Sequence, residues 1–226
     1  MNVRRYVLIS LGLVAGMLLV SAWAWPQLPP GAQIPIHWNI NGRANGFAPR
    51  ELGLFFVPLL ALVLTGLFAI VPRVEPRRAN LMRSSRAYGA VWIGVLCVMF
   101  VLHVVTTLIV LGHPLAISTW VHVALGLLFM VIGNYLGKVR SNFMFGIRTP
   151  WTLSSDLSWN RTHRLGGRLF VVFGFAMVVV GLIGEPRLAT SILIGGLIAI
   201  AVVLTVYSYL VWRADPDRGT FGSANR

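Results

Sequence analysis

Six long apolar stretches dominate this sequence. A helix that crosses the ~30 Å hydrocarbon core of a bilayer needs about 20 apolar residues at ~1.5 Å per residue. The stretches lack the alternation of apolar and polar residues that membrane-barrel strands show. Because backbone groups in lipid must bond to one another, the sequence predicts an all-α integral membrane protein with six transmembrane helices. The predicted spans are Tyr6–Trp25, Gly53–Pro72, Ala87–Leu111, Ser118–Gly137, Arg168–Gly184 and Thr190–Trp212, the fifth of which is short and has to extend backward from Gly167 or Gly166.

The composition agrees with this prediction. Of the 226 residues 57% are hydrophobic and only 11% are charged, whereas a typical soluble domain has about 25% charged residues. The formal net charge of +13, taken alone, suggests a nucleic-acid partner, but the charges lie in clusters between apolar stretches instead of on one water-facing surface. The single cysteine, Cys97, lies inside an apolar stretch, which excludes an intrachain disulfide and a cysteine-based zinc site.

The basic residues predict the orientation in the membrane, since Lys and Arg are enriched in cytoplasmic loops. Only Arg43, Arg50 and Arg187 fall on one set of alternate connections. The other sixteen fall on the opposite set, so both termini are predicted to be cytoplasmic. These sixteen are Arg4, Arg5, Arg73, Arg77, Arg78, Arg83, Arg86, Lys138, Arg140, Arg148, Arg161, Arg164, Arg168, Arg213, Arg218 and Arg226.

Two units are predicted along the chain. Residues 1–72 form a two-span unit with an outer loop at 26–52, and residues 73–226 form a four-span unit with an inner loop at 138–167. The first span has an alternative interpretation as a cleaved signal peptide, because Ala22-Trp23-Ala24 resembles a cleavage site. Its apolar run of about 20 residues exceeds the 7–15 of a signal sequence, which favours a retained helix.

The outer loop has the pattern of a short β structure. Prolines at its entry disfavour helix, and Ile34, Ile36, Trp38 and Ile40 alternate with other residues as in a strand. Asn41-Gly42 and Asn45-Gly46 are typical of turns, so we expect a compact two-strand or turn-rich cap. The alternative is a loop whose Trp38 and Phe47 simply lie at headgroup level. The candidate contact residues for a ligand or partner are His37, Trp38, Asn39, Asn41, Gly42, Asn45 and Gly46.

The inner loop is predicted to be partly helical. Thr152 or Ser154 is a candidate N-cap, with Asp156 in the first turn of a helix over about 154–165. Gly166-Gly167 is expected to hinge this helix to the fifth span. On the helix Arg161, Arg164 and Arg168 form one basic stripe, and Trp159 and His163 are i, i+4 neighbours on another face.

Two interpretations of the inner loop remain open. In one, its charges rest on anionic lipid phosphates, and Phe143, Phe145, Trp151 and Trp159 are interfacial aromatic residues. That account leaves several Asn and Thr side chains unexplained, which favours a defined polar site or a protein-docking surface. The candidate residues are Asn134, Lys138, Arg140, Asn142, Gly146, Arg148, Thr149, Pro150, Trp151, Trp159, Thr162, His163, Arg164 and Gly167.

Four of the five histidines, His37, His103, His113 and His122, are expected in the outer half. Ionisable residues inside a membrane suggest function, and clustered histidines can bind a metal. A ligand-lined polar cavity is a second interpretation. In the third, which we favour, the intramembrane histidines are neutral and bonded to hydroxyls such as those of Thr106, Thr107 or Ser118. We therefore predict no metal site and no cofactor.

Three motifs of the inner loop resemble the SdpI family. They are Ile132-Gly-Asn-Tyr-Leu-Gly-Lys-Val-Arg-Ser-Asn-Phe, Gly146-Ile-Arg-Thr-Pro-Trp-Thr-Leu-Ser-Ser and Trp159-Asn-Arg-Thr-His-Arg-Leu-Gly-Gly. The outer-loop stretch Pro35-Ile-His-Trp-Asn-Ile-Asn-Gly-Arg-Ala-Asn-Gly-Phe is similar to the short domain of unknown function that precedes this family in many members. The sequence has Asn45 where the family usually shows Asp, which removes a charge and weakens any cation role for that turn.

The resemblance implies a function. Members of the SdpI family are bacterial membrane proteins that give immunity to a secreted sporulation-delaying toxin peptide. Some also signal by holding a cognate transcriptional repressor at the membrane. We therefore expect a non-enzymatic immunity or signalling protein of the bacterial cytoplasmic (inner) membrane, with the bilayer, a toxin peptide outside and a repressor inside as partners, and no direct contact with nucleic acid. We expect the outer loop around His37–Gly46 to meet the peptide or another envelope signal, and the inner loop from Asn134 to Gly167 to report or dock on the cytoplasmic side.

The alternative function is a small transporter or membrane enzyme. In it Arg140, Arg148 and Thr149 bind an anionic headgroup or phosphate, since Arg pairs well with such oxygens. The sequence has no recognisable nucleophile–base pair and no carboxylate within a predicted span, which favours the immunity hypothesis.

Overall fold

Residues 2–218 are described by a computed structural model, in which six helices are long and apolar enough to cross a membrane. The six predicted spans are therefore confirmed, whereas the predicted orientation and the division at residue 72 stay predictions. Arg226, which was used to predict the orientation, lies outside the described residues. The elements are α1 (Val3–Ala24), η1 (Trp25–Gln27), β1 (Gln33–Trp38), β2 (Ala44–Pro49), α2 (Arg50–Val74), α3 (Arg78–Arg83), α4 (Ser85–Val110), α5 (Ile117–Leu136), α6 (Pro150–Leu153), α7 (Asp156–Ile183) and α8 (Pro186–Arg213).

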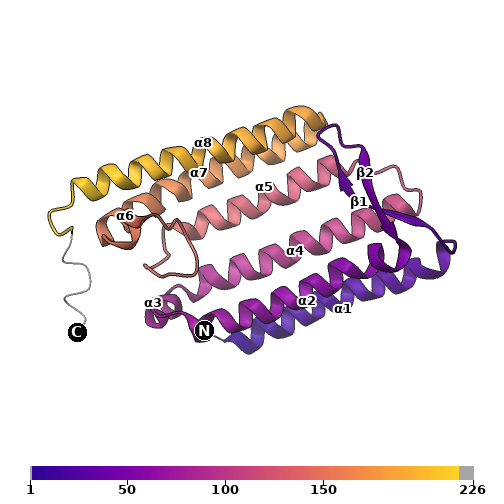
Figure 1. Ribbon diagram of the computed structural model, residues 1–226, viewed down its shortest axis with the longest axis horizontal. Helices are drawn as coiled ribbons and strands as arrows, with labels where there is room; N and C mark the ends of the chain where they lie inside the picture. The colour runs from indigo at the N-terminus through magenta and orange to yellow at the C-terminus, as the bar shows by residue number, and fades with distance from the viewer. Residues whose placement is uncertain (1, 219–226) are drawn as a thin grey trace.

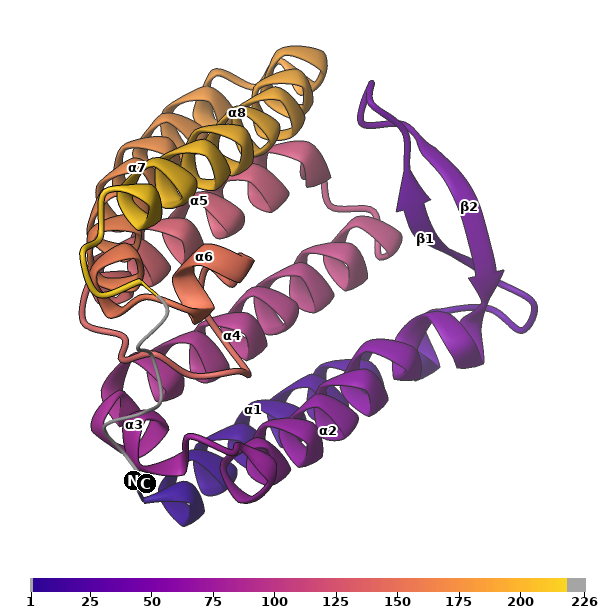
Figure 2. The same ribbon diagram turned by 60° about the vertical axis from the view of Figure 1, so that its left-hand side comes forward.

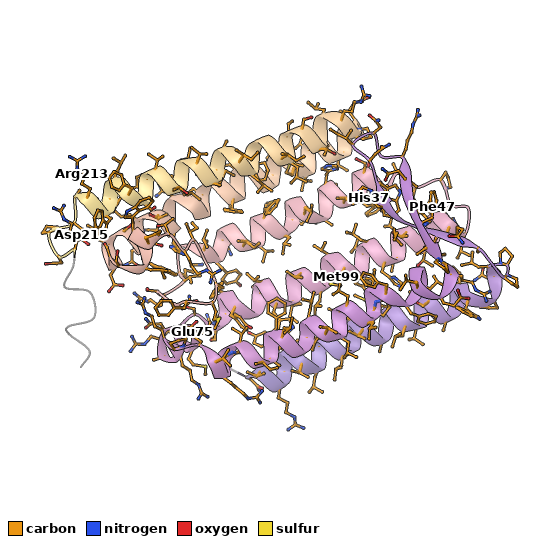
Figure 3. All side chains as sticks on the ribbon, viewed as in Figure 1. His37, Phe47, Glu75, Met99, Arg213 and Asp215 are labelled. Atoms are coloured by element: carbon orange, nitrogen blue, oxygen red, sulfur yellow. The ribbon has the colours of Figure 1, made fainter. Side chains whose placement is uncertain are left out.

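The long helices form two groups of three. Helices α1, α2 and α4 pack together, α7 packs on both α5 and α8, and the groups meet along α4 and α5 (Figures 1 and 2). The β1–β2 hairpin lies at one end of the bundle, which we call the hairpin end. Helices α3 and α6 and the α5–α7 loop (residues 137–155) lie at the other, the loop end (Figure 1). Figure 3 shows His37 and Phe47 at the hairpin end and Glu75 and Asp215 at the loop end, with Met99 between them.

Aromatic packing holds the first group together. Trp92 of α4 is fully buried, and its ring stacks on Phe68 of α2 with centroids 5.5 Å apart. Tyr6 of α1 lies 5.7 Å from the Trp92 ring, and Tyr88 lies 6.1 Å from it, edge to face. The Tyr88 hydroxyl donates a hydrogen bond to the Phe68 carbonyl over 2.7 Å. One large side chain thus contacts all three helices.

Glycines allow α5 and α7 of the second group to approach closely. A Cβ atom on Gly133 would lie 2.6 Å from the carbonyl oxygen of Gly167, and one on Gly174 would lie 2.4 Å from that of Gly126. Small residues at such crossings are the usual means of bringing membrane helices into contact, since lipid gives no hydrophobic driving force between them. The backbones of α5 and α7 therefore pack directly against each other.

The predicted hinge at Gly166-Gly167 is wrong. Helix α7 runs without interruption from Asp156 to Ile183, so the inner-loop helix and the fifth span are one element. Both glycines are buried in this helix, and a Cβ on Gly166 would lie 2.6 Å from the Ile147 side chain. These glycines permit close packing, and the flanking backbone hydrogen bonds keep the helix continuous.

The start of α7 differs slightly from the prediction. Its N-cap is Ser155, whose Oγ accepts a hydrogen bond from the Ser158 amide over 2.9 Å. The expected caps, Thr152 and Ser154, lie just before it, so that prediction is wrong. Asp156 is in the first turn as predicted. Its negative charge interacts favourably with the positive end of the helix dipole there.

The α5–α7 approach can be tested with a matched pair of glycine variants. We expect Gly174→Ala to lower the free energy of unfolding by about 1–3 kcal/mol, because the added methyl group meets backbone on α5. Gly66→Ala adds the same methyl group to α2, where no atom lies within 4 Å, so it should be neutral or slightly stabilising. Denaturation of the purified protein in mixed micelles measures both. Equal losses would contradict the packing described above.

Candidate functional site

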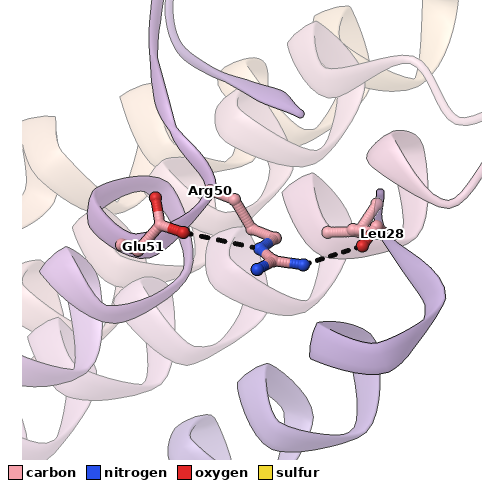
Figure 4. Close-up of polar contacts among 3 residues, drawn as sticks. All are labelled: Leu28, Arg50 and Glu51. Carbon is pink, nitrogen blue, oxygen red and sulfur yellow. Dashed lines mark hydrogen bonds and ion pairs between the residues drawn. The ribbon is translucent and has the colours of Figure 1, made fainter. Parts of the chain in front are cut away.

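The hairpin is fixed to the first group where α2 begins. One guanidinium nitrogen of Arg50 donates to the Leu28 carbonyl over 2.8 Å, and Arg50 Nε lies 3.6 Å from Glu51 Oε1 (Figure 4). The guanidinium carbon lies 3.9 Å from the centre of the Trp25 ring. Arg50 therefore joins the two ends of the connection that carries the hairpin.

The hairpin packs on α2 through one of its faces. β1 and β2 pair antiparallel, with Ile34 opposite Ala48, and both of these side chains are buried. A Cβ on Gly53, in the first turn of α2, would lie 2.3 Å from Ile34 Cβ. The predicted two-strand cap is confirmed, and this contact sets its position on the helices.

One of the two predicted turns in the hairpin is confirmed. Gly42 has φ +72°, and Asn39 Oδ1 accepts hydrogen bonds from the amides of Asn41 (2.9 Å) and Arg43 (3.1 Å). Asn39 is an Asx-type acceptor that closes the turn on its own backbone. Asn39 and Gly42, two of the predicted contact residues, therefore form this turn. Trp38 lies just before it, at the end of β1.

The predicted turn at Asn45-Gly46 is wrong. Both residues lie in β2, and Gly46 pairs with His37 of β1, where a Cβ on the glycine would lie 3.0 Å from His37 Cβ. His37 Nδ1 lies 2.6 Å from Asn45 Oδ1, so the ring donates to the amide oxygen. An asparagine therefore satisfies this histidine without a carboxylate.

The hairpin tip reaches the second group of helices. Arg187 Nε, in the first turn of α8, donates to Asn41 Oδ1. A Cβ on Gly42 would lie 3.3 Å from the Pro186 ring and 3.6 Å from Ser118 of α5. The loop between α1 and α2 is thus held at the starts of both α5 and α8.

The hairpin also leaves apolar side chains uncovered. Ile36 is 52% exposed, Ile40 is 46% exposed and Phe47 is 55% exposed. They flank the His37–Asn45 pair, which is itself exposed. The hairpin end therefore offers an apolar and hydrogen-bonding surface on a rigid support.

At the loop end a buried carboxylate joins the two groups. Glu75, just after α2, is 3% exposed, and its two oxygens lie 3.1 and 3.2 Å from the Phe143 amide of the α5–α7 loop. Glu75 Oε1 also accepts from the Arg77 amide over 2.8 Å. The Arg77 guanidinium lies over the Phe143 ring, 4.3 Å from its centre.

Further bonds extend this junction along the turn between α2 and α4. Arg77 donates to Ser141 Oγ, and the Asn80 side chain donates to the Ser141 carbonyl over 2.9 Å. Ser84 Oγ accepts from the Arg140 amide over 2.8 Å. The α5–α7 loop, which belongs to the second group, is therefore bonded to the first.

Asn142 folds the first part of this loop. It is fully buried, and its Oδ1 accepts from the amides of Met144 (2.9 Å) and Phe145 (2.8 Å). Its amide nitrogen donates to the Arg140 carbonyl over 2.9 Å. The side-chain oxygen and nitrogen of this predicted site residue are thus hydrogen-bonded within its own loop.

A histidine of α7 holds the middle of the loop. Trp159 and His163 stack with centroids 4.0 Å apart, as their spacing predicted. His163 Nδ1 lies 2.8 Å from the Trp159 carbonyl and must donate to it, whereas Nε2 accepts from the Ile147 amide over 3.0 Å. This pattern fixes a neutral imidazole with its hydrogen on Nδ1. Trp159 Nε1 donates to the Val139 carbonyl over 2.7 Å, and Gly146, at φ +112°, passes close to the ring.

The end of the loop forms the short helix α6. Thr149 and Thr152 make a reciprocal capping box, and Thr149 Oγ1 also lies 2.9 Å from Ser208 Oγ of α8. Pro150 is in the first turn of α6, and the Trp151 ring packs edge to face on Tyr209 at 5.2 Å. The predicted residues of this segment hold α6 against α8.

The remaining inner-loop candidates divide between surface and packing. Asn134, Lys138 and Arg164 are exposed, whereas Thr162 is fully buried and Gly167 packs against α5. Arg148 donates to the Phe143 carbonyl. Two of the three residues predicted to bind an anion, Arg148 and Thr149, are thus bonded within the protein.

The intramembrane histidines have separate partners. His103 Nε2 lies 3.0 Å from Ser21 Oγ of α1, which was not among the expected hydroxyls. His122 Nδ1 lies 2.6 Å from the Ser118 carbonyl and 3.2 Å from its Oγ, as expected for Ser118, and Nε2 lies 3.4 Å from Thr190 Oγ1 of α8. Within residues 2–218 no group of three His, Cys, Asp or Glu side chains is placed to hold a metal ion.

The sequence analysis missed several residues that build the loop end. Glu75 and Asp215 are buried carboxylates, and Ser155 donates to Asp215 Oδ2, which fixes the start of α7 beside the end of α8. Ser84 and Ser141 were also missed. The available signal was the presence of a few acidic residues in strongly basic connections.

The role of Gly146 can be tested against a glycine of similar conformation. Gly146→Ala and Gly112→Ala both place alanine at positive φ (+112° and +91°), which costs about 1–2 kcal/mol. Only Gly146→Ala also brings a methyl group within 2.6 Å of His163 Nε2. We expect trypsin to cleave that variant faster after Arg140 and Arg148, as measured by mass spectrometry of the fragments. Equal cleavage in the two variants would show that the ring contact does not hold the loop.

Comparison with known proteins agrees with the motifs of both loops. Residues 138–210 match the SdpI/YfhL protein family, and residues 12–62 match the domain of unknown function DUF1648. The chain is 26% identical over 204 residues to "Immunity protein SdpI" of Bacillus subtilis (strain 168), an alignment that covers 89% of this chain and 93% of that protein. No solved structure matches. The resemblance is therefore confirmed: the chain is a multi-pass membrane protein that carries an SdpI/YfhL family region preceded by the DUF1648 domain.

Proposed function

We propose that this protein is a membrane immunity protein that protects the cell against a secreted antimicrobial toxin peptide. The observation that carries the proposal is the similarity to Immunity protein SdpI along almost the full length of both chains. The SdpI family is not an enzyme family, and the polar residues of the α5–α7 loop are bonded to one another and to neighbouring helices, which suits a structural framework.

The hairpin is the proposed contact surface for the peptide. Ile36 and Phe47 are large apolar side chains exposed at the end of the bundle, on strands fixed by the Arg50 and Gly53 contacts. Exposed apolar groups on a rigid support favour binding, because little conformational entropy is lost when a partner covers them. The predicted orientation places this surface outside the cell, where a secreted peptide arrives.

The loop end is the proposed docking surface for a cytoplasmic transcriptional repressor. Arg161, Arg164 and Arg168 are exposed on one side of α7, next to a loop that is itself well ordered by hydrogen bonds. Such a stripe suits an acidic surface on the partner. Peptide binding at the hairpin then shifts the two helix groups from one arrangement to another. This requires that the two arrangements bind the peptide with different affinity.

Expression in a bacterium sensitive to the sporulation-delaying toxin peptide tests the proposal. We expect the wild-type protein to raise the lethal peptide concentration and Phe47→Ala to reduce that protection by roughly tenfold, as for a central apolar contact. Trp23→Ala is the matched control, because it removes a comparably exposed aromatic side chain (52%) at the same end but outside the hairpin.

Two results would contradict the proposal. No protection by the wild-type protein at verified membrane expression would contradict the immunity function itself. Equal protection by Phe47→Ala and Trp23→Ala would contradict the hairpin as the contact surface.

Arg161→Gln combined with Arg164→Gln should keep full protection, because these charges lie at the opposite end of the bundle.

A further inference from the structure

A half-open apolar pocket of about 270 Å³ lies at the loop end, where the two helix groups meet. Ala87 and Val91 of α4 form one side of it, and Tyr135 of α5 forms another. Phe145 and Ile147 of the α5–α7 loop close it toward the loop end. The pocket thus lies between the first group and the loop that the second group extends to it.

Two basic residues, Lys138 and Arg140, adjoin the apolar wall. Lys138 Nζ lies 5.5 Å from the centre of the Tyr135 ring, which lines the pocket. Arg140 is the next residue after lining Val139, and its amide is bonded to Ser84, which lies three residues before lining Ala87. Lys138 and Arg140 are both exposed. The lining contains no carboxylate, and Glu75 on the neighbouring turn is buried with its oxygens already accepting backbone hydrogen bonds.

We propose that this pocket binds one acyl chain of an anionic phospholipid whose phosphate lies between Lys138 and Arg140. An apolar wall suits a hydrocarbon chain, and a free anion would gain nothing from it. Ammonium and guanidinium groups form strong charge-assisted bonds with phosphate oxygens, and basic pockets between membrane helices favour anionic headgroups. The lipid is then a wedge that stabilises the contact between the α5–α7 loop and α4.

Two other features of the protein are less suited to an anionic lipid than this pocket. A second apolar pocket, of about 330 Å³, lies between α1 and α2, and the charged residue in its lining is Glu51. The neighbouring cation, Arg50, is paired with this carboxylate, so the pair brings no net positive charge to attract an anionic headgroup. The Arg161, Arg164 and Arg168 stripe is basic, but none of these residues lines the pocket beside α4. The α4–α5 site, in contrast, has an apolar wall with Lys138 beside it and no carboxylate in the lining.

Native mass spectrometry of the purified full-length protein with added phosphatidylglycerol or phosphatidylcholine of identical acyl chains tests the proposal. We expect wild-type protein to prefer phosphatidylglycerol, and Lys138→Gln combined with Arg140→Gln to weaken that binding by roughly tenfold, because charges near a headgroup contribute strongly. Arg161→Gln combined with Arg213→Gln removes the same charge at the same end, away from the pocket, and should change the affinity less than twofold. Val91→Phe, which fills the pocket, should weaken binding of both lipids.

Three outcomes would overturn the proposal. Equal affinity of the wild-type protein for the two lipids would remove the role of the cations. Equal losses in the two charge variants would mean that phosphatidylglycerol responds to overall charge and not to this pocket. Displacement of phosphatidylglycerol by millimolar inorganic phosphate would indicate a free-anion site. Both charge variants alter exposed side chains, so they should fold normally, which the thermal unfolding midpoint checks.

Discussion

Direct backbone contact between α5 and α7 is the constraint on which the loop end depends. Gly133 and Gly167 leave no room for a side chain between these helices, so the end of α5 and the start of α7 are held side by side. The α5–α7 loop, which connects these two helices, must therefore fold back on itself at the loop end. Asn142 and His163 supply the hydrogen bonds that allow this, and Gly146 gives the backbone space to pass the imidazole ring.

Each helix group extends a connection to the other group, at opposite ends of the bundle. The hairpin comes from the first group and reaches α8 through Asn41 and Arg187. The α5–α7 loop comes from the second group and meets Glu75 of the first. A shift of one group relative to the other therefore has to break polar contacts at both ends. This arrangement gives a proposed signal at the hairpin a physical route to the loop end, and a lipid beside α4 would act on the same junction.

The conspicuous polar residues of the inner loop turn out to build it. Asn142 and Thr149 bond to neighbouring backbone, and Trp159 donates to Val139. Their fixed spacing in the sequence reflects the geometry of these bonds, and a ligand site is not needed to explain them. The surfaces left for partners are the ones around them, which are the exposed cations at the loop end and the apolar side chains of the hairpin.

The six spans could be predicted from the sequence alone, as could the hairpin with its Asn41-Gly42 turn and the Trp159–His163 stack. Each depends on residues close together along the chain, where periodicity and local backbone preference decide the outcome. Three outcomes could not be predicted in this way: α7 is continuous through Gly166-Gly167, Gly46 lies in a strand, and Glu75 joins the two groups. These outcomes depend on contacts between residues far apart in the sequence, because a glycine pair can hinge a helix or pack one, and the neighbouring helix determines which.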